Sequence, residues 1–155
     1  MDARPLLERV ARALKAGRLE AVLVGNAAAA LQGAPVTTLD FDFMFRKTAA
    51  NLRKLKIAAR ELDAVILKPF YPASDLFRLV NDGIGLQVDF MPRLHGIRSF
   101  EGLRARAVGV RLGGATLLVA DLRDIVRSKR AANRPRDRAV LDVLEATLRE
   151  KARKD

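Results

Sequence analysis

Apolar residues recur at two different spacings along the chain, and the spacing separates the predicted helices from the predicted strands. Residues 3–16 carry leucine and valine at the period of an amphipathic helix, and Gly17 supplies a stop. Residues 39–45 alternate instead, with Asp40 and Asp42 on one face and phenylalanines on the other, which is the period of a strand. The whole pattern predicts helices over residues 3–16, 26–31, 48–62, 99–104, 122–132 and 136–151, and strands over residues 19–24, 39–45, 64–67, 76–80, 86–91, 107–112 and 116–119.

The chain length favours one domain spanning residues 1–155, with a charged tail at 150–155 that we expect to be disordered. Cysteine is absent, which excludes a disulfide framework and a thiolate zinc site. The first 17 residues interleave bases with apolar positions, unlike a signal peptide, and no apolar run is long enough for a membrane span. We therefore expect a cytoplasmic protein without a membrane partner.

The net charge of +11 is unevenly distributed. Residues 46–68 hold seven bases and two acids, whereas residues 21–45 hold only Asp40 and Asp42 as charged residues. An acidic site in a basic frame suits polyphosphate or RNA. An arginine-rich composition that charges every surface explains the same excess, and composition does not separate the two explanations.

Asp40 and Asp42 are two apart on a predicted strand, so both carboxylates project from the same face, with Cβ atoms roughly 6.6–7 Å apart. Two like charges on a mostly apolar strand repel each other and lose solvation, and a bound cation relieves both effects. Magnesium prefers one or two carboxylates together with substrate phosphates. The alternative is an edge strand with a solvated acidic face.

Gly25 and Asn26 lie between a predicted buried strand and a predicted helix. Free backbone N–H groups at such a turn bind phosphate, and glycine permits the close approach. The Asn26 side chain is equally consistent with a plain helix cap.

Lys129 falls on the apolar stripe of the helix predicted over residues 122–132, and Asp137 falls on the apolar stripe of the following helix. A buried ion pair between Lys129 and Asp137 is the simplest interpretation. His95, the only histidine, follows a proline turn, and we expect it to be an exposed loop residue.

These motifs resemble the nucleotidyltransferase superfamily, and in particular its minimal nucleotidyltransferase and AbiEii-type toxin group. Gly25-Asn26, thirteen further residues and Asp40-Phe41-Asp42 are similar to the family's glycine turn and Asp-x-Asp strand. Residues 33–35 and Thr38 are similar to the segment before the acids, and residues 86–90 to the strand that carries a third acid, here Asp89. Residues 100–107 and 121–137 are similar to the end of the toxin group's domain.

The resemblance implies an α/β (α+β) fold, with a small mixed sheet flanked by helices and a C-terminal helical pair. It implies two Mg²⁺ ions on Asp40, Asp42 and Asp89, and transfer of NMP from an NTP substrate to a hydroxyl of RNA, such as tRNA, or of a protein. Asp89 would help to deprotonate that hydroxyl, although from its position alone it reads as a strand-end acid. Gly25, Asn26, Thr38 and Lys129 would contact the nucleotide phosphates. The toxin group further implies an antitoxin partner.

Two positions depart from the family pattern. Asn26 stands where serine or glycine is usual, and Val36 stands where arginine is frequent. These departures indicate either a different substrate or a catalytically inactive nucleotide-binding or RNA-binding module of the same fold.

Overall fold

The computed structural model describes residues 3–38, 40–67 and 75–154. Its elements follow one another in the order α1 (Arg4–Gly17), β1 (Ala21–Val24), α2 (Gly25–Leu31), β2 (Phe41–Phe45), α3 (Ala49–Glu61), β3 (Val65–Leu67), β4 (Phe77–Asn81), η1 (Asp82–Ile84), β5 (Leu86–Met91), α4 (Phe100–Arg106), β6 (Val108–Leu112), β7 (Ala115–Val119), α5 (Leu122–Ala132) and α6 (Pro135–Lys154). The predicted mixed α/β class is therefore confirmed.

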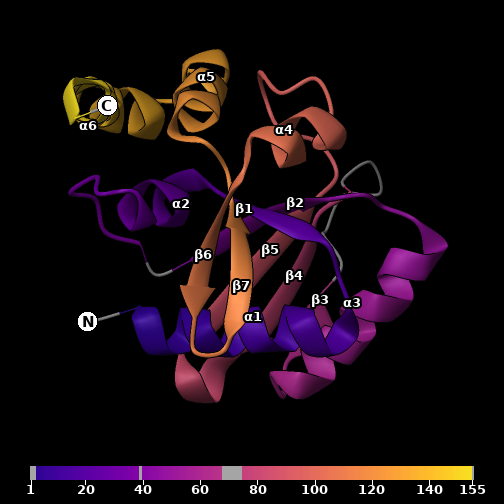
Figure 1. Ribbon diagram of the computed structural model, residues 1–155. Helices are drawn as coiled ribbons and strands as arrows, with labels where there is room; N and C mark the ends of the chain where they lie inside the picture. The colour runs from indigo at the N-terminus through magenta and orange to yellow at the C-terminus, as the bar shows by residue number, and fades with distance from the viewer. Residues whose placement is uncertain (1–2, 39, 68–74, 155) are drawn as a thin grey trace.

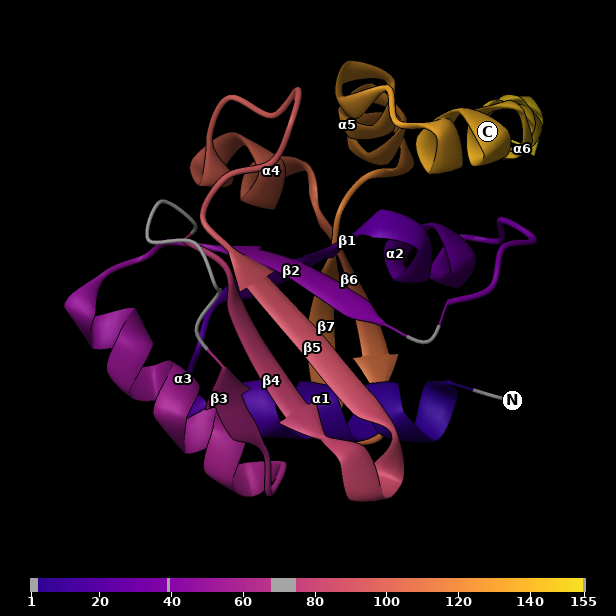
Figure 2. The same cartoon turned by 180° about the vertical axis from the view of Figure 1, so that it is seen from behind.

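The seven strands form one mixed sheet in the order β3-β4-β5-β2-β1-β7-β6. β2 runs parallel to β5, and β1 runs parallel to β7. The remaining neighbours are antiparallel, including the β4–β5 hairpin that turns through η1. Figures 1 and 2 show α1 and α3 on one side of this sheet and α2, α4, α5 and α6 on the other. No helix in the described part of the chain is both long and apolar enough to cross a membrane.

The face toward α1 and α3 is held by aromatic residues. Phe43 stacks on Phe90 of the neighbouring strand at 5.2 Å between ring centroids, and Phe45 meets Phe90 edge-on at 5.8 Å. Phe41, Phe43 and Phe45 are almost completely buried. Because side chains alternate across a strand, this burial fixes Asp42 on the opposite face.

Two element ends differ from the expected ones. β2 begins at Phe41, so Asp40 lies just before the strand, while Leu39 lies outside the described residues. The tail expected to be disordered is helical through Lys154. Lys151 donates to Gln32 at 3.3 Å, and Arg153 pairs with Glu150 one turn earlier. Bases in the last turn of α6 also complement the negative end of the helix dipole. Asp155 lies outside the described residues.

The close packing of α1 on α3 gives a stability prediction. A Cβ at Gly17 would lie 2.8 Å from the Lys54 carbonyl oxygen, which is backbone and cannot easily move. We expect Gly17→Ala to lower the free energy of unfolding by about 1–2 kcal/mol, because the steric clash exceeds the gain in helix propensity. Urea unfolding measures the change. Gly83→Ala, whose Cβ would meet only a side-chain atom at 3.3 Å, is the control and should change stability by less than about 0.5 kcal/mol. A Gly17→Ala protein at least as stable as the wild type would contradict the prediction.

Candidate active site

The turn from β1 into α2 lies against one of the predicted metal ligands. Gly25 has a φ of 69°, a left-handed conformation that favours glycine. A Cβ at this position would lie 3.3 Å from the Asp42 carboxylate oxygen Oδ2, so glycine also leaves room for that carboxylate. The N-cap residue of α2 is Val24, and no side chain caps the helix. The interpretation of Asn26 as a helix cap is therefore wrong, because the helix has already begun at Gly25.

Asp42 and Asp89 are direct neighbours in the parallel β2–β5 pair. They project from the same face of the sheet, which is the geometry that the third-acid interpretation required. Asp40 lies just before β2, where Thr38 Oγ1 donates to its carbonyl oxygen at 2.7 Å and accepts from its backbone N–H at 3.3 Å. The Thr38 hydroxyl therefore fixes the backbone that carries Asp40.

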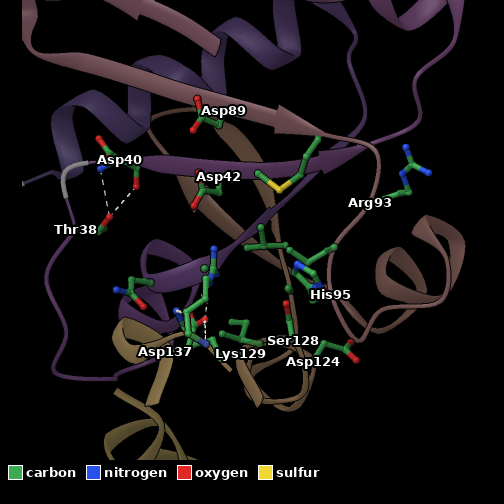
Figure 3. A pocket seen from close by; sticks show the side chains of 18 of the residues that line it. Thr38, Asp40, Asp42, Asp89, Arg93, His95, Asp124, Ser128, Lys129 and Asp137 are labelled. Carbon is green, nitrogen blue, oxygen red and sulfur yellow. Dashed lines mark hydrogen bonds and ion pairs between the residues drawn. The ribbon is translucent and has the colours of Figure 1, made fainter. Parts of the chain in front are cut away.

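One cavity of about 750 Å³ brings the predicted residues together. Figure 3 shows Asp40, Asp42 and Asp89 on one wall of the cavity, with Lys129 and Asp137 on the facing wall. The cavity is lined by every predicted site residue, namely Gly25, Asn26, Thr38, Asp40, Asp42, Asp89, Lys129 and Asp137.

The predicted ion pair between α5 and α6 is confirmed. Lys129 Nζ lies 3.7 Å from Asp137 Oδ1, and both side chains are largely buried. Burial lowers the pKa of the Lys129 ammonium, while Asp137 acts to raise it. For Asp137, burial acts to raise the pKa, but hydrogen bonds from the Arg134 side chain and backbone lower it overall. Lys129 thus has a partner already and still faces the cavity.

Arginines neutralise three of the five aspartates that line the cavity. Arg78 binds Asp89 through two hydrogen bonds of 2.8 and 3.1 Å. Asp137 accepts from Arg134, and Asp124 accepts from Arg106 at 2.7 Å. The carboxylates of Asp40 and Asp42 make no hydrogen bond or ion pair with any described residue.

The unpaired state of Asp42 is reflected in its pKa, which is raised from 3.8 to about 6. Burial is the largest cause, followed by the charges of Asp89 and Asp40, whereas Lys129 and Arg136 oppose the shift. Desolvation and like charges disfavour the ionised carboxylate, and a bound cation would reverse both effects.

The residues fit a hard divalent cation, because two unpaired carboxylates on one wall supply the oxygen ligands that Mg²⁺ prefers alongside phosphate. Asp89 is less available, since Arg78 occupies both of its oxygens. Among the described residues, no group of three or more acids or histidines is close enough to hold a metal ion. A site with three aspartates and two ions therefore stays a prediction.

The Asn26 amide oxygen is buried and has no hydrogen-bond partner among the described residues. An unsatisfied buried acceptor costs about 1–3 kcal/mol. A donor group on a bound ligand, or an ordered water, would remove this cost. The Asn26 oxygen is therefore a third group in this cavity, after the carboxylates of Asp40 and Asp42, that has no partner among the described residues.

Sequence reasoning missed Arg78 and the arginine environment of the cavity. Arg78 stands opposite Asp89 in the β4–β5 hairpin, in a register fixed by the Asn81–Leu86 pair. Counting outward from that pair would have placed the two residues together. His95 is exposed, as expected, yet it also lines the cavity with Arg93 and Arg136. The loop and helix ends that carry these residues have no periodic signal in the sequence.

Comparison with known proteins shows where this architecture has been seen. No protein-family profile matches the sequence, and no curated protein matches it. The structure is similar to a candidate nucleotidyltransferase from Thermotoga maritima at 20% identity, covering 97% of this chain and 89% of the other with a TM-score of 0.55. It is also similar to ANT(2'')-Ia in complex with adenylyl-2''-tobramycin, at 13% identity over 93% of this chain and 88% of the other, with a TM-score of 0.64.

A third similar structure is the antigenic nucleotidyltransferase-like protein of Paracoccidioides brasiliensis, at 15% identity, with a TM-score of 0.51 over 97% of this chain and 87% of the other. At these identities the likeness concerns the fold. It agrees with the resemblance carried by the glycine turn and the aspartate strands. The chain therefore has the nucleotidyltransferase fold.

Proposed function

We propose that this protein is a magnesium-dependent nucleotidyltransferase that moves NMP from an NTP to an acceptor hydroxyl, with pyrophosphate as the leaving group. The observation that carries the proposal is the position of Asp40 and Asp42, two aspartates without a partner among the described residues, beside the Gly25 turn. Both line the cavity of about 750 Å³, which we call the main cavity. The wall opposite them supplies positive charge from Lys129, Arg134 and Arg136. Such a cavity suits a polyphosphate held between a divalent cation and basic side chains.

Each proposed ligand group has a distinct role. Asp40 and Asp42 would hold the ion, which would neutralise phosphate charge and polarise the phosphoryl group under attack. Gly25 allows phosphate to approach the backbone, and Lys129 offers an ammonium to it. The unsatisfied amide oxygen of Asn26 is an acceptor and would take a donor group of the ligand. Thr38 acts through the backbone of Asp40. Asp89 can accept the acceptor's proton or bind a second ion once Arg78 releases it.

We further propose that the acceptor is RNA rather than a polycationic aminoglycoside such as the one bound by ANT(2'')-Ia. An aminoglycoside carries several ammonium groups and needs free carboxylates. Here Asp89, Asp124 and Asp137 are already paired with arginine, and the remaining two acids are the proposed metal ligands. The excess of basic side chains favours an anionic acceptor. Protein as the acceptor, the toxin role and an antitoxin partner stay predictions from the resemblance.

A second candidate function is a catalytically inactive nucleotide-binding or RNA-binding module. The Arg78–Asp89 pair favours it, because a guanidinium occupies both oxygens of the third acid. Val36, which stands where arginine is frequent in the family that the sequence resembles, packs against the hydrophobic core and cannot contact phosphate through a charge. Nucleotide binding without transfer would identify this alternative.

A labelling experiment tests the enzyme against the inactive module. The protein is incubated with radiolabelled NTPs and Mg²⁺, together with total RNA or cell lysate. We expect label on RNA that disappears with EDTA and falls at least about 100-fold in Asp42→Asn, because the ion supplies several kcal/mol of transition-state stabilisation. Asp82→Asn changes an exposed acid outside the cavity and is the matched control. Label on a polypeptide would show that the acceptor is a protein rather than RNA. Nucleotide binding without any transfer of label would support the inactive module.

Asp42→Asn should also change how stability depends on pH. The folded-state pKa of about 6 lies above the ordinary value of 3.8, so the folded protein binds this proton more tightly than the unfolded chain. The contribution of Asp42 to stability should therefore fall as pH rises from about 4 to about 6, against the opposite contribution of carboxylates such as Asp137, whose pKa is lowered. We expect Asp42→Asn to be more stable by about 1–3 kcal/mol at pH 7, with the difference vanishing near pH 4. Urea unfolding across this pH range measures the difference, and a pH-independent difference would refute the assignment of the pKa to Asp42.

Lys129→Met separates a phosphate ligand from a purely structural lysine. We expect nucleotide affinity to fall about tenfold through loss of a charge-assisted contact. Stability should change by less than about 1 kcal/mol, because Asp137 keeps its hydrogen bonds from Arg134. Arg130→Met, an exposed residue paired with Glu145, is the control for both measurements. Unchanged affinity together with a large loss of stability would leave Lys129 with only the ion-pair role.

A further inference from the structure

A second cavity, of about 550 Å³, lies between α4 with its preceding loop and α5. Figures 1 and 2 show these two helices side by side on the same side of the sheet. We call it the arginine cavity, because the charged residues that line it, among those described, are all arginines. Its lining consists of Gly96, Arg98, Ser99, Gly102, Arg106 and Arg127.

A single buried carboxylate orients two of the three guanidinium groups. Asp124, which is 1% exposed, accepts from Arg106 Nε at 2.7 Å and from Arg127 Nη1 at 3.2 Å. These two bonds leave both terminal nitrogens of Arg106, and Nε and Nη2 of Arg127, without a protein acceptor among the described residues. Asp124 therefore holds the two arginines in place without using their full donor capacity.

The third arginine has no counter-charge in the part of the chain that the structure describes. Arg98 makes no hydrogen bond or ion pair with any described residue. Three arginines on one carboxylate leave an excess of two positive charges in the arginine cavity. The neighbouring arginines of α5 differ, because Arg123 pairs with Asp121 and Arg130 pairs with Glu145. The imbalance thus belongs to this cavity rather than to the helix surface in general.

Two glycines allow the arginines to converge. A Cβ at Gly96 would lie 2.9 Å from both the Arg127 carbonyl oxygen and the Ala131 Cβ, so glycine lets the loop lie directly on α5. A Cβ at Gly102 would lie 3.2 Å from Arg106 Nη1 and from Ser99 Oγ. The Ser99 oxygen accepts from the Gly102 N–H at 3.0 Å, which leaves the hydroxyl proton free to be donated.

We propose that the arginine cavity binds a terminal phosphate monoester, and that the 5′ end of the acceptor RNA supplies it. A phosphate monoester carries about −1.5 to −2 charge at pH 7 and three strong acceptor oxygens, which matches the excess of two positive charges. A carboxylate or an internal phosphodiester carries a single negative charge and would leave part of that excess unbalanced. Guanidinium groups also match phosphate through two parallel hydrogen bonds.

The position of Asp124 links this site to the proposed reaction. Asp124 lines the main cavity as well as anchoring two residues of the arginine cavity, so the two cavities lie on either side of one side chain. An RNA whose 5′-phosphate occupies the arginine cavity would have its end held next to the proposed nucleotide site. The assignment of RNA rests on the proposed function, whereas the phosphate site itself rests on the arginines.

The test compares two RNA oligonucleotides that differ only at the 5′ end, one phosphorylated and one with a hydroxyl. Both carry a fluorophore at the 3′ end, and binding is followed by fluorescence anisotropy without NTP or Mg²⁺. We expect the phosphorylated RNA to bind about tenfold more tightly, as for a charge-assisted contact. Arg98→Ala should remove this preference, and Arg127→Gln, which removes the charge but keeps an amide donor, should reduce it. Arg60→Ala, an exposed arginine of α3 on the far side of the sheet, should retain it.

Each outcome decides one part of the proposal. Equal binding of the two oligonucleotides to the wild type, together with no Arg98-dependent stabilisation by inorganic phosphate, would overturn the site, and so would equal losses in Arg98→Ala and Arg60→Ala. Thermal stability measured with and without inorganic phosphate distinguishes the source of the phosphate. If phosphate stabilises the wild type but not Arg98→Ala, and the RNA shows no 5′-phosphate preference, the cavity is a site for free phosphate and the assignment of RNA is overturned. Because nothing in this assay requires catalysis, a 5′-phosphate preference without nucleotide transfer would refute the enzyme proposal alone, and transfer without the preference would refute only this site.

Discussion

The structure around the main cavity depends on the unbalanced charge of two carboxylates. Asp42 is largely withdrawn from water and lies beside Asp89 in the sheet and near Asp40 in the chain, which is why its pKa is raised to about 6. An arrangement that opposes its own ionisation is stable only because the rest of the fold enforces it. The glycine turn, the arginine on Asp89 and the lysine facing the cavity can each be understood as a response to this charge.

The aromatic core holds Asp42 beside Asp89. β2 and β5 use alternate residues for two purposes: Phe41, Phe43 and Phe90 pack toward α1 and α3, while Asp42 and Asp89 face the cavity. A slip of one residue in register would bury both acids among phenylalanines and expose the aromatic rings. The register that stabilises the core is therefore the register that brings the two acids together, and neither can change without the other.

The fold was largely predictable from sequence because most of its elements carry strong local signals. Three of these signals are contained within a few residues each. They are the alternation from Asp40 to Phe45, the Thr48 cap that accepts from the Asn51 N–H, and the apolar stripe of α5. The convergence of Asp42, Asp89 and Gly25 came from the resemblance, since periodicity does not give strand order.

What sequence could not give is the pairing of side chains over long separations. Arg78 reaches Asp89 only because the hairpin register puts them opposite each other, and Arg106 reaches Asp124 only because α4 lies beside α5. Asn26 is a residue type that commonly caps helices. However, α2 already begins at Gly25, and the Asn26 amide oxygen has no partner among the described residues. Contacts of this kind depend on tertiary packing rather than on local pattern.

The distribution of arginines around the aspartates carries more information about function than the fold does. A fold of this kind supports many chemistries, so the acceptor has to be inferred from the charges left unbalanced. Among the described residues, Asp89 and Asp137 are paired with arginine, the carboxylates of Asp40 and Asp42 have no cationic partner, and the arginine cavity keeps an excess of positive charge. A polyphosphate with its cation would satisfy the first imbalance, and a phosphorylated acceptor end would satisfy the second. Asp124, which lines the main cavity and is bonded to two of the three arginines of the arginine cavity, is the side chain that connects the two sites.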